Sequence, residues 1–312
     1  MFSTQERYWK VCLRKRNDDA DYFWKDKNAQ FYTIKTPARY WIADPFLITK
    51  DGKDYLFVEA FDRITHKGKI GYYDLSKSKN PRLKIVIKEP YHLSFPNVYQ
   101  ERGKVYLIPE SICNRTIQRY YSKSFPDVWE LEKILVPEIY AVDSILLESM
   151  DGGKFLMTSV SPEFSPCHVD NILFRTVNEE VVLDSRQIVK SGDYGVRNGG
   201  RILLIDGKQI RIGQNCTNKE YGKGIVFWKI SSIQPYMEEK YMEIDAATVD
   251  HIIDKGVHAQ IYGVHSYSVS SKFEAIDYFV AGKKPMYITI PELIHRKYSS
   301  FKRMLRRGHA HG

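Results

Sequence analysis

The sequence lacks any long hydrophobic run, and it is poor in cysteine. No stretch of the 312 residues approaches the roughly 20 apolar residues that a membrane-spanning helix needs. The N-terminal seven residues have neither the apolar core nor the cleavage site of a secretory signal, so we expect a cytoplasmic chain. The four cysteines, Cys12, Cys113, Cys167 and Cys216, match no zinc-ligand spacing. We therefore predict reduced thiols and no protein-built metal site.

Several short motifs that mark common enzyme folds are also missing. The sequence contains no Walker loop, no GxGxxG after a strand, no HExxH and no GxSxG elbow. No DxD pair stands in a Rossmann-like setting, which argues against an ordinary nucleotide-sugar transferase fold. Basic and aromatic residues do not interleave as they do in RNA-binding sheets, so we expect no nucleic-acid partner.

The chain does have an excess of positive charge and many aromatic residues. Lys and Arg number 47 against 38 Asp and Glu, which gives a net charge of +9. This balance favours anionic partners such as phosphorylated small molecules or an acidic membrane face. A soluble protein with scattered lysines explains it equally well. The 22 Tyr and 15 Phe residues suit strands that are packed on one face.

An internal repeat is the strongest signal in the sequence. Short strand-like runs separated by Gly-containing turns recur in a unit of about 50 residues, and each unit has a polar residue near the start of its first strand. These polar residues follow one another at steps of 53, 46, 55 and 67 residues, and they are Asp44, Asn97, Asp143, Asn198 and His265. This spacing is typical of four-stranded propeller blades.

We therefore predict an all-β fold, a single five-bladed β-propeller over residues 1–285 with a C-terminal amphipathic helix. The N-terminal segment is expected to help close the ring. The long last step indicates a connection inserted at about residues 236–254. The expected blades lie near residues 39–90, 91–138, 139–190, 191–245 and 255–285.

The C-terminal region, residues 286–312, differs from the rest of the chain. From Pro291, which fits the first turn of a helix, apolar residues recur at helical spacing and the other face is almost wholly basic. Such a helix can make peripheral contact with an anionic membrane through Leu293–Arg307. The alternative is a terminal helix that docks on the propeller rim with a solvated cationic face.

In a propeller, the first strand of every blade lines a central channel. The five repeated polar residues should therefore form one ring, with a neighbouring tier from the second strands, namely Glu59, Glu110, Ser159, Gln214 and Asp277. Carboxylates that converge on one mouth raise the pKa of some of their members, which separates acid from base. This chemistry suits a glycosidic or glycosyl-phosphate centre, where one carboxylate deprotonates the attacking hydroxyl and a protonated group or a cation assists the leaving group.

From this alignment we predict three catalytic residues, Asp44, Glu110 and Asp143. The expected substrate-binding residues are Glu59, His92, Asn97, Arg197, Asn198, Arg201, Arg211, Gln214 and His265. The three arginines and Lys223 are clustered in the fourth blade, where they could hold a phosphate. Each of these residues also has a structural explanation, such as capping a turn, pairing with a charge inside the channel, or lying on the surface.

Five ordered motifs resemble a known module. They resemble the propeller module at the N-terminus of plant glucosamine inositolphosphorylceramide transferases, which is similar to modules in bacterial surface-polysaccharide gene clusters. The resemblance runs from about residue 8 to residue 277 and includes a later segment from Gly199 to Gly222. The five motifs are Trp41–Leu47, Tyr55–Glu59, His92–Val98, Ile108–Ser111 and Ala141–Asp143.

The module in turn is similar to the five-bladed propellers of furanosidases of the glycoside hydrolase family 43 type and of mannoside phosphorylases. The resemblance implies that Asp44, in its Ala-Asp-Pro motif, is a general base. A second Asp and a Glu from later blades complete the furanosidase set, and Asp143 and Glu110 correspond to them only by type and order. The Arg197–Asn198 pair departs from the expected Arg-Pro or Arg-Gly.

Three functions fit these observations. The first is a glycosyltransferase of bacterial surface polysaccharide assembly (capsule or O-antigen) at the inner membrane face, working beside other polysaccharide-assembly enzymes. It would take a phosphorylated sugar donor, with a furanose such as phosphoribosyl diphosphate or a nucleotide sugar as candidates, and a glycan or lipid-linked glycan acceptor. A divalent cation such as Mg²⁺ could accompany a diphosphate donor. The second function is an intracellular glycoside hydrolase or phosphorylase, and the third is a non-catalytic glycan-binding propeller.

Overall fold

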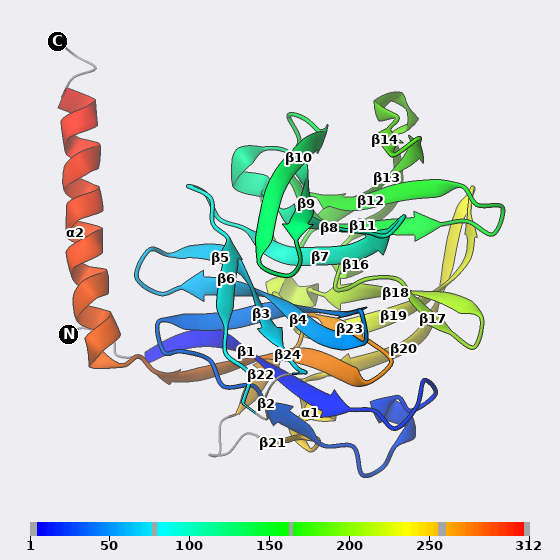
Figure 1. Ribbon diagram of the computed structural model, residues 1–312, viewed down its shortest axis with the longest axis horizontal. Helices are drawn as coiled ribbons and strands as arrows, with labels where there is room; N and C mark the ends of the chain where they lie inside the picture. Colours follow the sequence, from blue (N-terminus) through cyan, green and yellow to red (C-terminus); the bar gives the residue numbers. More distant parts are fainter. Residues whose placement is uncertain (1–4, 77–79, 162–164, 255–259, 309–312) are drawn as a thin grey trace.

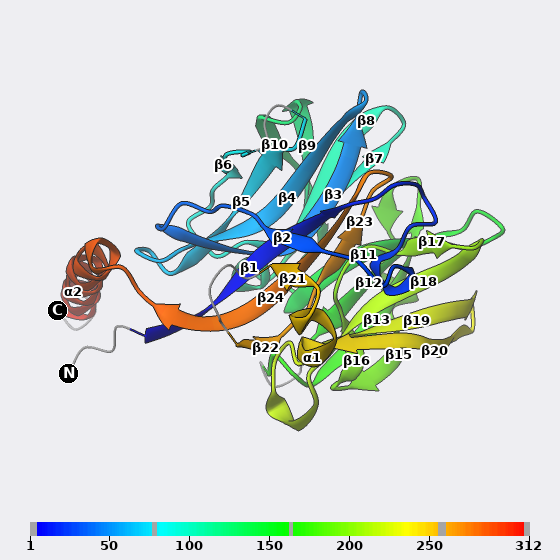
Figure 2. The ribbon, with the colours of Figure 1, turned by 90° about the horizontal axis from the view of Figure 1, so that it is seen from below.

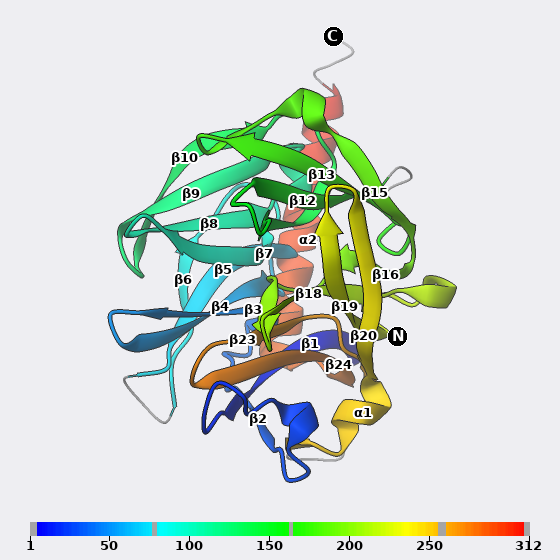
Figure 3. The same cartoon turned by 90° about the vertical axis from the view of Figure 1, so that its right-hand side faces the viewer.

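The computed structural model describes residues 5–76, 80–161, 165–254 and 260–308, and its strands form five sheets grouped around a common centre (Figures 1 and 3). The predicted all-β fold, a five-bladed β-propeller with a C-terminal helix, is confirmed. All four cysteines are free thiols.

The first two blades are four-stranded antiparallel sheets in which strand order follows the sequence. The first hairpin turns on Asp51–Gly52, with φ of 51° and 73°, and the second on Arg102–Gly103, with φ of 48° and 79°. Two consecutive positive φ angles match the twist of a two-residue hairpin, which is why Gly stands at the second position. The strands are β3 (Tyr40–Lys50), β4 (Lys53–Asp62), β5 (Lys67–Asp74) and β6 (Lys84–Ile87) in blade 1, then β7 (Ser94–Glu101), β8 (Lys104–Glu110), β9 (Ile117–Ser124) and β10 (Val128–Val136) in blade 2.

Blades 3 and 4 each contain five strands. Residues 236–254, which we expected to form an inserted connection, are mostly β20, the outer strand of blade 4. The predicted insertion was therefore wrong for the residues of this strand. Three consecutive charged residues, Glu238–Lys240, stand in its middle and five of its ten residues are exposed, which hides the strand signal. The strands are β11 (Ala141–Glu148), β12 (Lys154–Val160), β13 (Val169–Val177), β14 (Glu180–Val181) and β15 (Gln187–Gly192) in blade 3, then β16 (Tyr194–Asn198), β17 (Leu203–Ile205), β18 (Lys208–Asn215), β19 (Gly224–Ile233) and β20 (Tyr236–Asp245) in blade 4.

Blade 5 joins the two ends of the propeller. Strand β1 pairs antiparallel with β24 along its whole length, from Gln5 opposite Lys283 to Lys15 opposite Phe273. The N-terminal segment therefore supplies the third strand of the last blade and closes the ring, which leaves no open sheet edge between first and last blades (Figure 2). The strands of this blade are β22 (Ile261–Gly263), β23 (Tyr267–Val269), β24 (Phe273–Lys283), β1 (Gln5–Lys15), β2 (Phe31–Thr33) and β21 (Ile253–Asp254).

Helices are few. A short α1 (Ala246–Asp250) connects blades 4 and 5, and its N-cap Asp245 accepts the Thr248 N–H in a capping box. Four single-turn 3₁₀ helices occur in loops, at Phe23–Lys25, Ile112–Asn114, Leu183–Ser185 and Thr217–Lys219.

The C-terminal helix α2 spans Met286–Gly308 and extends away from the blades (Figures 1 and 2). It begins before the predicted start, so Pro291 lies inside its second turn and leaves one helical carbonyl without its usual N–H partner. Its first turns dock on the propeller, because Glu292 contacts His66 at 2.9 Å and Lys284 at 2.6 Å. The side chains of Phe301, Met304 and Leu305 lie outside the described ones. No helix in the described residues is long and apolar enough to cross a bilayer.

The hydrophobic core lies between neighbouring blades. One cluster takes fully buried side chains from blades 1, 2 and 3, including Phe46, Phe57, Leu107 and Ile145. A second cluster joins blades 4 and 5, so each sheet packs face to face on the next. Near the centre this packing gives way to polar groups.

Candidate active site

A bulge interrupts the inner strand of each of the first three blades. The pairing register shifts between Ala43 and Phe46, between Ser94 and Asn97, and between Val142 and Ile145. The residue that follows the first member of each pair has a positive φ, 51° for Asp44, 44° for Phe95 and 52° for Asp143. An L-residue rarely adopts this conformation, and such strain concentrates at functional sites. Asp44 and Asp143 thus occupy equivalent positions, as the repeat predicts, whereas the equivalent in blade 2 is Phe95.

The predicted placement of Asn97 in that ring was wrong by two residues. Its register partner, Ile108, shows that it corresponds to Phe46 and Ile145, beyond the bulge. The sequence hides the shift because Asn is the polar residue nearest to the motif's Pro96, whereas the true equivalent is the apolar Phe95.

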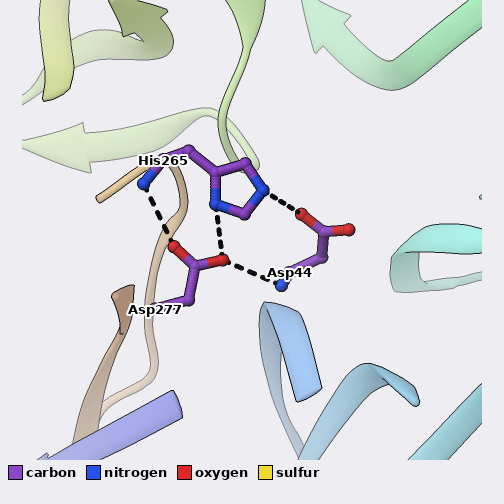
Figure 4. A group of neighbouring side chains, drawn as sticks. All are labelled: Asp44, His265 and Asp277. Carbon is purple, nitrogen blue, oxygen red and sulfur yellow. Dashed lines mark hydrogen bonds and ion pairs between the residues drawn. The ribbon is translucent and has the colours of Figure 1, made fainter. Parts of the chain in front are cut away.

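Asp44 is the centre of a buried polar network (Figure 4). Its Oδ2 accepts the Phe95 N–H at 3.0 Å, and its Oδ1 accepts the Ser266 hydroxyl at 3.2 Å. The same Oδ1 lies 3.3 Å from His265 Nε2. Ser266 and His265 come from the loop between β22 and β23, so three blades hold one carboxylate.

On the other side of the imidazole lies Asp277, from β24 (Figure 4). Its Oδ1 accepts the backbone N–H groups of His265 and Ser266 at 3.1 and 2.9 Å, and its Oδ2 lies 2.8 Å from His265 Nδ1. Trp9 stacks on the imidazole with ring centres 3.9 Å apart. The ring is therefore fixed between two carboxylates and one indole.

The surroundings of this network raise the pKa of both Asp44 and His265. Burial raises the pKa of Asp44 to about 6; the His265 cation lowers it, and the charges of Asp143 and Asp277 raise it. Burial lowers the pKa of His265, but the charges of Asp277 and Asp44 outweigh it and leave the pKa raised. Near neutral pH, Asp44 is therefore an ionised carboxylate whose pKa lies close to the pH of the medium, which suits a general base.

A second network surrounds Arg197, at the end of β16. Its Nε lies 2.5 Å from Asp143 Oδ2 and its Nη2 lies 3.2 Å from Glu110 Oε2. Gln214 donates to the same Asp143 oxygen at 3.0 Å. Burial and the Asp143 charge raise the pKa of Glu110 well above its usual range, although the Arg197 cation opposes them. The raised pKa favours the protonated form of Glu110, beside a fixed cation.

Glu59 and His92 form a third group. Gly68 N–H donates to His92 Nδ1 at 2.9 Å, which leaves the proton of the neutral ring on Nε2, 3.4 Å from Glu59 Oε1. Burial lowers the pKa of His92 to about 4, so the ring is neutral. Burial, followed by the charges of Asp44 and Glu110, raises the pKa of Glu59 well above its usual range. Both side chains therefore border the carboxylate group without adding charge to it.

Two of the predicted binding residues hold the backbone instead. Asn97 donates to the Ser144 carbonyl at 3.0 Å, and Asn198 donates to the Asp143 carbonyl at 2.8 Å. Both are buried, and both fix the bulge of β11 from the neighbouring blades. They position Asp143.

The predicted arginine cluster of blade 4 does not form. Arg211 is fully buried, and Glu238, the Gly195 and Val196 carbonyls and the Asn198 amide oxygen take all five of its N–H donors, so none remains for a ligand. Lys223 pairs with Glu220 near the surface.

Arg201 also lies away from the carboxylates. It donates to the Val98 carbonyl, further along β7 than Phe95. Of the three arginines that the sequence placed at the phosphate, only Arg197 reaches Asp143 and Glu110. The prediction failed for Arg211 because a strand alternates its side chains between faces, and it failed for Arg201 because this residue lies in the loop between β16 and β17.

Most residues of these networks lie in a region that matches a known family, whereas Trp9 and Asp277 lie outside it. Residues 29–273 match the model described as glucosamine inositolphosphorylceramide transferase 1, N-terminal. The chain belongs to this family. It is 30% identical over 230 residues to glucosamine inositolphosphorylceramide transferase 1 of Arabidopsis thaliana, and 29% identical over 213 residues to that of Oryza sativa subsp. indica. These matches cover 70% and 65% of the chain, but the chain spans only 28% and 27% of the relatives' length.

Solved structures show the same fold at low identity. A thermostable family-43 glycoside hydrolase superposes with a TM-score of 0.56 at 14% identity, over 80% of this chain and 91% of its own. The catalytic domain of Coprinopsis cinerea GH62 alpha-L-arabinofuranosidase superposes with a TM-score of 0.55 at 10% identity, over 86% and 97%. The glucosamine inositolphosphorylceramide transferase N-terminal family therefore has the propeller fold of these hydrolases.

In this member of the family, one group of side chains has the composition of a cation site. Asp44, His265 and Asp277 offer ligand atoms that lie within 4.8 Å of one another, the only such group in the described residues. The Asp277 oxygens already accept three backbone N–H groups, and both imidazole nitrogens face carboxylates. Mg²⁺ prefers an octahedron of oxygen ligands, which this set does not supply. The arrangement fits a charge-coupled triad better than a Mg²⁺ site.

Three members of the site escaped the sequence analysis or received no role in it. Asp277 was placed in the second tier as the fifth-blade counterpart of Glu59, and that position is what could have identified it. Ser266 follows the predicted His265 directly. Trp9 comes from β1, outside every repeat, and no pattern in the sequence links it to the centre.

Proposed function

We propose that this chain is a glycosyltransferase that moves a sugar from a phosphorylated donor to a hydroxyl of a glycan or lipid-linked acceptor. The observation that carries the proposal is the buried grouping of Asp44 on His265 with Glu110 and Asp143 on the Arg197 cation, and the raised pKa values of Asp44 and Glu110 agree with it. A base, an acid and a cation in one buried centre are the groups that glycosyl transfer from a phosphate requires.

Asp44 has the role of base. It takes the proton of the acceptor hydroxyl as that oxygen forms its bond to the anomeric carbon. The bond between that carbon and the donor phosphate oxygen breaks, and its electron pair leaves with the phosphate. The proton on Asp44 then passes to solvent. The pKa of about 6 keeps most Asp44 ionised at pH 7 while leaving it basic enough to accept the proton.

Arg197 and Glu110 act at the leaving group. Arg197 is the cation nearest to the carboxylates, and it stabilises the negative charge that develops on the departing phosphate. Glu110, protonated because of its burial, can donate a hydrogen bond or its proton to the same oxygens. Asp143 and Gln214 hold the guanidinium in place.

His265 and Asp277 tune the base. The imidazolium contacts Asp44 and prevents its pKa from rising further, while Asp277 fixes the ring and the loop that carries it. Both residues act through Asp44 and are positioning residues. Their burial, at 2% and 0% exposure, leaves them no room to touch a substrate.

The relatives support the substrate class. They are named glucosamine inositolphosphorylceramide transferases, which describes transfer of a sugar to a phosphorylated lipid acceptor. We propose for this chain the same general reaction with its own substrates, in surface-polysaccharide assembly, capsule or O-antigen. We propose a furanosyl donor, as phosphoribosyl diphosphate or a nucleotide sugar, and the propeller fold shared with furanosidases supports that choice.

Helix α2 supports a peripheral site at an anionic membrane. Its described half exposes an apolar stripe at Tyr287, Ile290, Ile294 and Tyr298, each more than half exposed. The sequence from residue 295 to 307 adds six Lys and Arg residues and no acid. An apolar stripe with flanking cations complements anionic lipid, which would bring the enzyme to a lipid-linked acceptor.

The proposal is tested by incubating the purified chain with a panel of phosphorylated sugars and glycan acceptors and identifying products by mass. Transfer of the sugar to an acceptor hydroxyl supports the proposal. Release of free sugar or sugar 1-phosphate from glycans, with no transfer, would instead identify a hydrolase or phosphorylase that uses the same carboxylates. Binding without any product would identify a glycan-binding propeller.

A further inference from the structure

A cavity of about 380 Å³ lies between blades 2, 3 and 4, away from Asp44. Its inner lining comes from the later halves of β7 and β11 and from the segment that leads into β17, including Asn97, Leu147 and Arg201. A strand rises about 3.3 Å per residue, so Leu147 lies about 13 Å along β11 from Asp143. The cavity therefore belongs to the other end of the inner strands.

Arg201 is the unusual residue of this cavity. Its Nη2 donates to the Val98 carbonyl, while its buried Nε has no hydrogen-bond partner. No carboxylate among the described residues forms an ion pair with it, and burial alone lowers its pKa to about 10. The guanidinium remains charged at neutral pH. Arg201 as a whole is half-buried, but its Nε is buried, and a buried donor of a cation without a counter-ion is costly unless a ligand satisfies it.

An aromatic pair separates this cation from the candidate active site. Phe46 and Phe95 are fully buried and meet edge to face, with ring centres 4.9 Å apart. Phe46 follows Asp44 by two residues, Phe95 donates its N–H to Asp44, and the Arg201 guanidinium lies 5.9 Å from the Phe46 ring. The two rings thus lie between Asp44 and Arg201, so a ligand on Arg201 does not share the catalytic carboxylates.

The other cations of the cavity are neutralised. Lys154 pairs with Glu101, and Arg119 pairs with Glu132 and Glu179. A further acid, Glu148, lies exposed on the lining. Of the lining cations, Arg201 alone has no acidic partner. The apolar part of the same lining consists of leucine, isoleucine and phenylalanine side chains, including Leu146, Leu147, Phe155, Ile202 and Leu203.

We propose that this cavity binds a small amphiphilic anion, with a carboxylate or phosphate on Arg201 and an aliphatic body against the apolar lining. The charged group satisfies the orphaned donor and neutralises the cation, and the aliphatic part fills the remaining volume. The proposed anion contact is separate from the proposed transfer reaction, because Arg201 has no part in that reaction.

The test measures binding of octyl phosphate and octanoate by calorimetry, with octanol and inorganic phosphate as probes that lack one half of the chemistry. The proposal expects one site for at least one of the two anions, and at least 10-fold weaker binding of octanol and of inorganic phosphate. The relative affinities of octyl phosphate and octanoate identify which anionic group the site prefers. Equal affinity for octanol, or no binding of either anion, overturns the proposal.

Two variants locate the site. Arg201→Met keeps the side-chain length without the charge and should weaken anion binding at least 10-fold. Lys154→Gln, which removes a lining cation that already has a partner, should change it less than about 3-fold. If Arg201 were only structural, Arg201→Met would lower the melting temperature and leave binding unchanged, and that pair of results refutes the proposal. We expect a melting temperature that is equal or higher, because an unpaired buried charge is gone.

Discussion

The carboxylate of Asp277 accepts the backbone N–H of Asp44 at 3.0 Å, although 233 residues separate them in the sequence. The bond connects the last blade to the bulge of the first blade. It means that closure of the propeller and the geometry of the candidate base depend on the same side chain. The fifth blade, which gave the weakest repeat in the sequence, thus supplies most of the support for Asp44.

Asp277→Asn should destabilise the protein. The carboxylate accepts N–H groups from His265, Ser266 and Asp44, and an amide offers only one acceptor oxygen and no charge. We expect the free energy of unfolding to fall by about 2–3 kcal/mol, the range for hydrogen bonds to a charged group. Chemical denaturation measures it, and a change within the error of the fit would show that these bonds do not hold the blade.

Transfer activity should depend on the ionisation of Asp44. With a pKa of about 6, the carboxylate gains a proton as the pH falls below 6 and can no longer act as base. The rate at low substrate should therefore fall tenfold per pH unit below about 6. An acid limb near pH 4, the range of an unperturbed carboxylate, would indicate that another group is the base.

Arg197→Met should be strongly destabilising at neutral and alkaline pH. The folded-state pKa of Glu110 is raised, so its ionisation opposes folding as pH rises, and the Arg197 cation offsets that effect. We expect a loss of about 3–5 kcal/mol near pH 8, because removing one partner leaves buried charge uncompensated. The loss should shrink toward pH 5. A pH-independent loss would point to packing alone.

The apolar stripe of α2 should govern membrane binding. Replacing Ile290, Ile294 and Tyr298 by Ser leaves the charge unchanged and alters only exposed positions, so the propeller should remain folded. We expect cosedimentation with phosphatidylglycerol vesicles to fall at least tenfold, and wild-type binding to neutral phosphatidylcholine vesicles to be weak. Unchanged cosedimentation of the triple variant would show that the apolar stripe does not contribute to membrane binding.

The fold could be predicted because it repeats. Hairpin pairs such as Asp51–Gly52 and the recurrence of a polar residue every 50 or so positions mark the blades directly. The outer strands were harder to predict. Strand β20 has a run of charged residues, Glu238–Lys240, in its middle and is half exposed at the rim. Helix α2 continues N-terminal to Pro291 because packing of Ile288 and Glu292 on the propeller outweighs one lost hydrogen bond.

Site residues could be predicted only where a charged or polar residue occupies the repeated position in the strand register. Asp44 and Asp143 share the bulge position, and Glu59 and Glu110 pair with the residues that precede it, so the repeat identifies them. Asn97 lies two residues beyond the bulge position, which in blade 2 is occupied by the apolar Phe95, and the sequence alone does not reveal this. Arg201 and Arg211 are near Arg197 in sequence, yet they point into different surroundings.

The central claim is that Asp44 is the base of glycosyl transfer, and the most direct test compares Asp44→Asn with Asp54→Asn, a buried aspartate in the same blade. The raised pKa of Asp44 means that its ionisation opposes folding above pH 6, so Asp44→Asn should be at least as stable as wild type at pH 7. The account predicts that Asp44→Asn lowers the single-turnover transfer rate at pH 7.5 by about 10²–10⁴-fold, while Asp54→Asn retains it. Transfer at the wild-type rate by a folded Asp44→Asn protein would contradict the account.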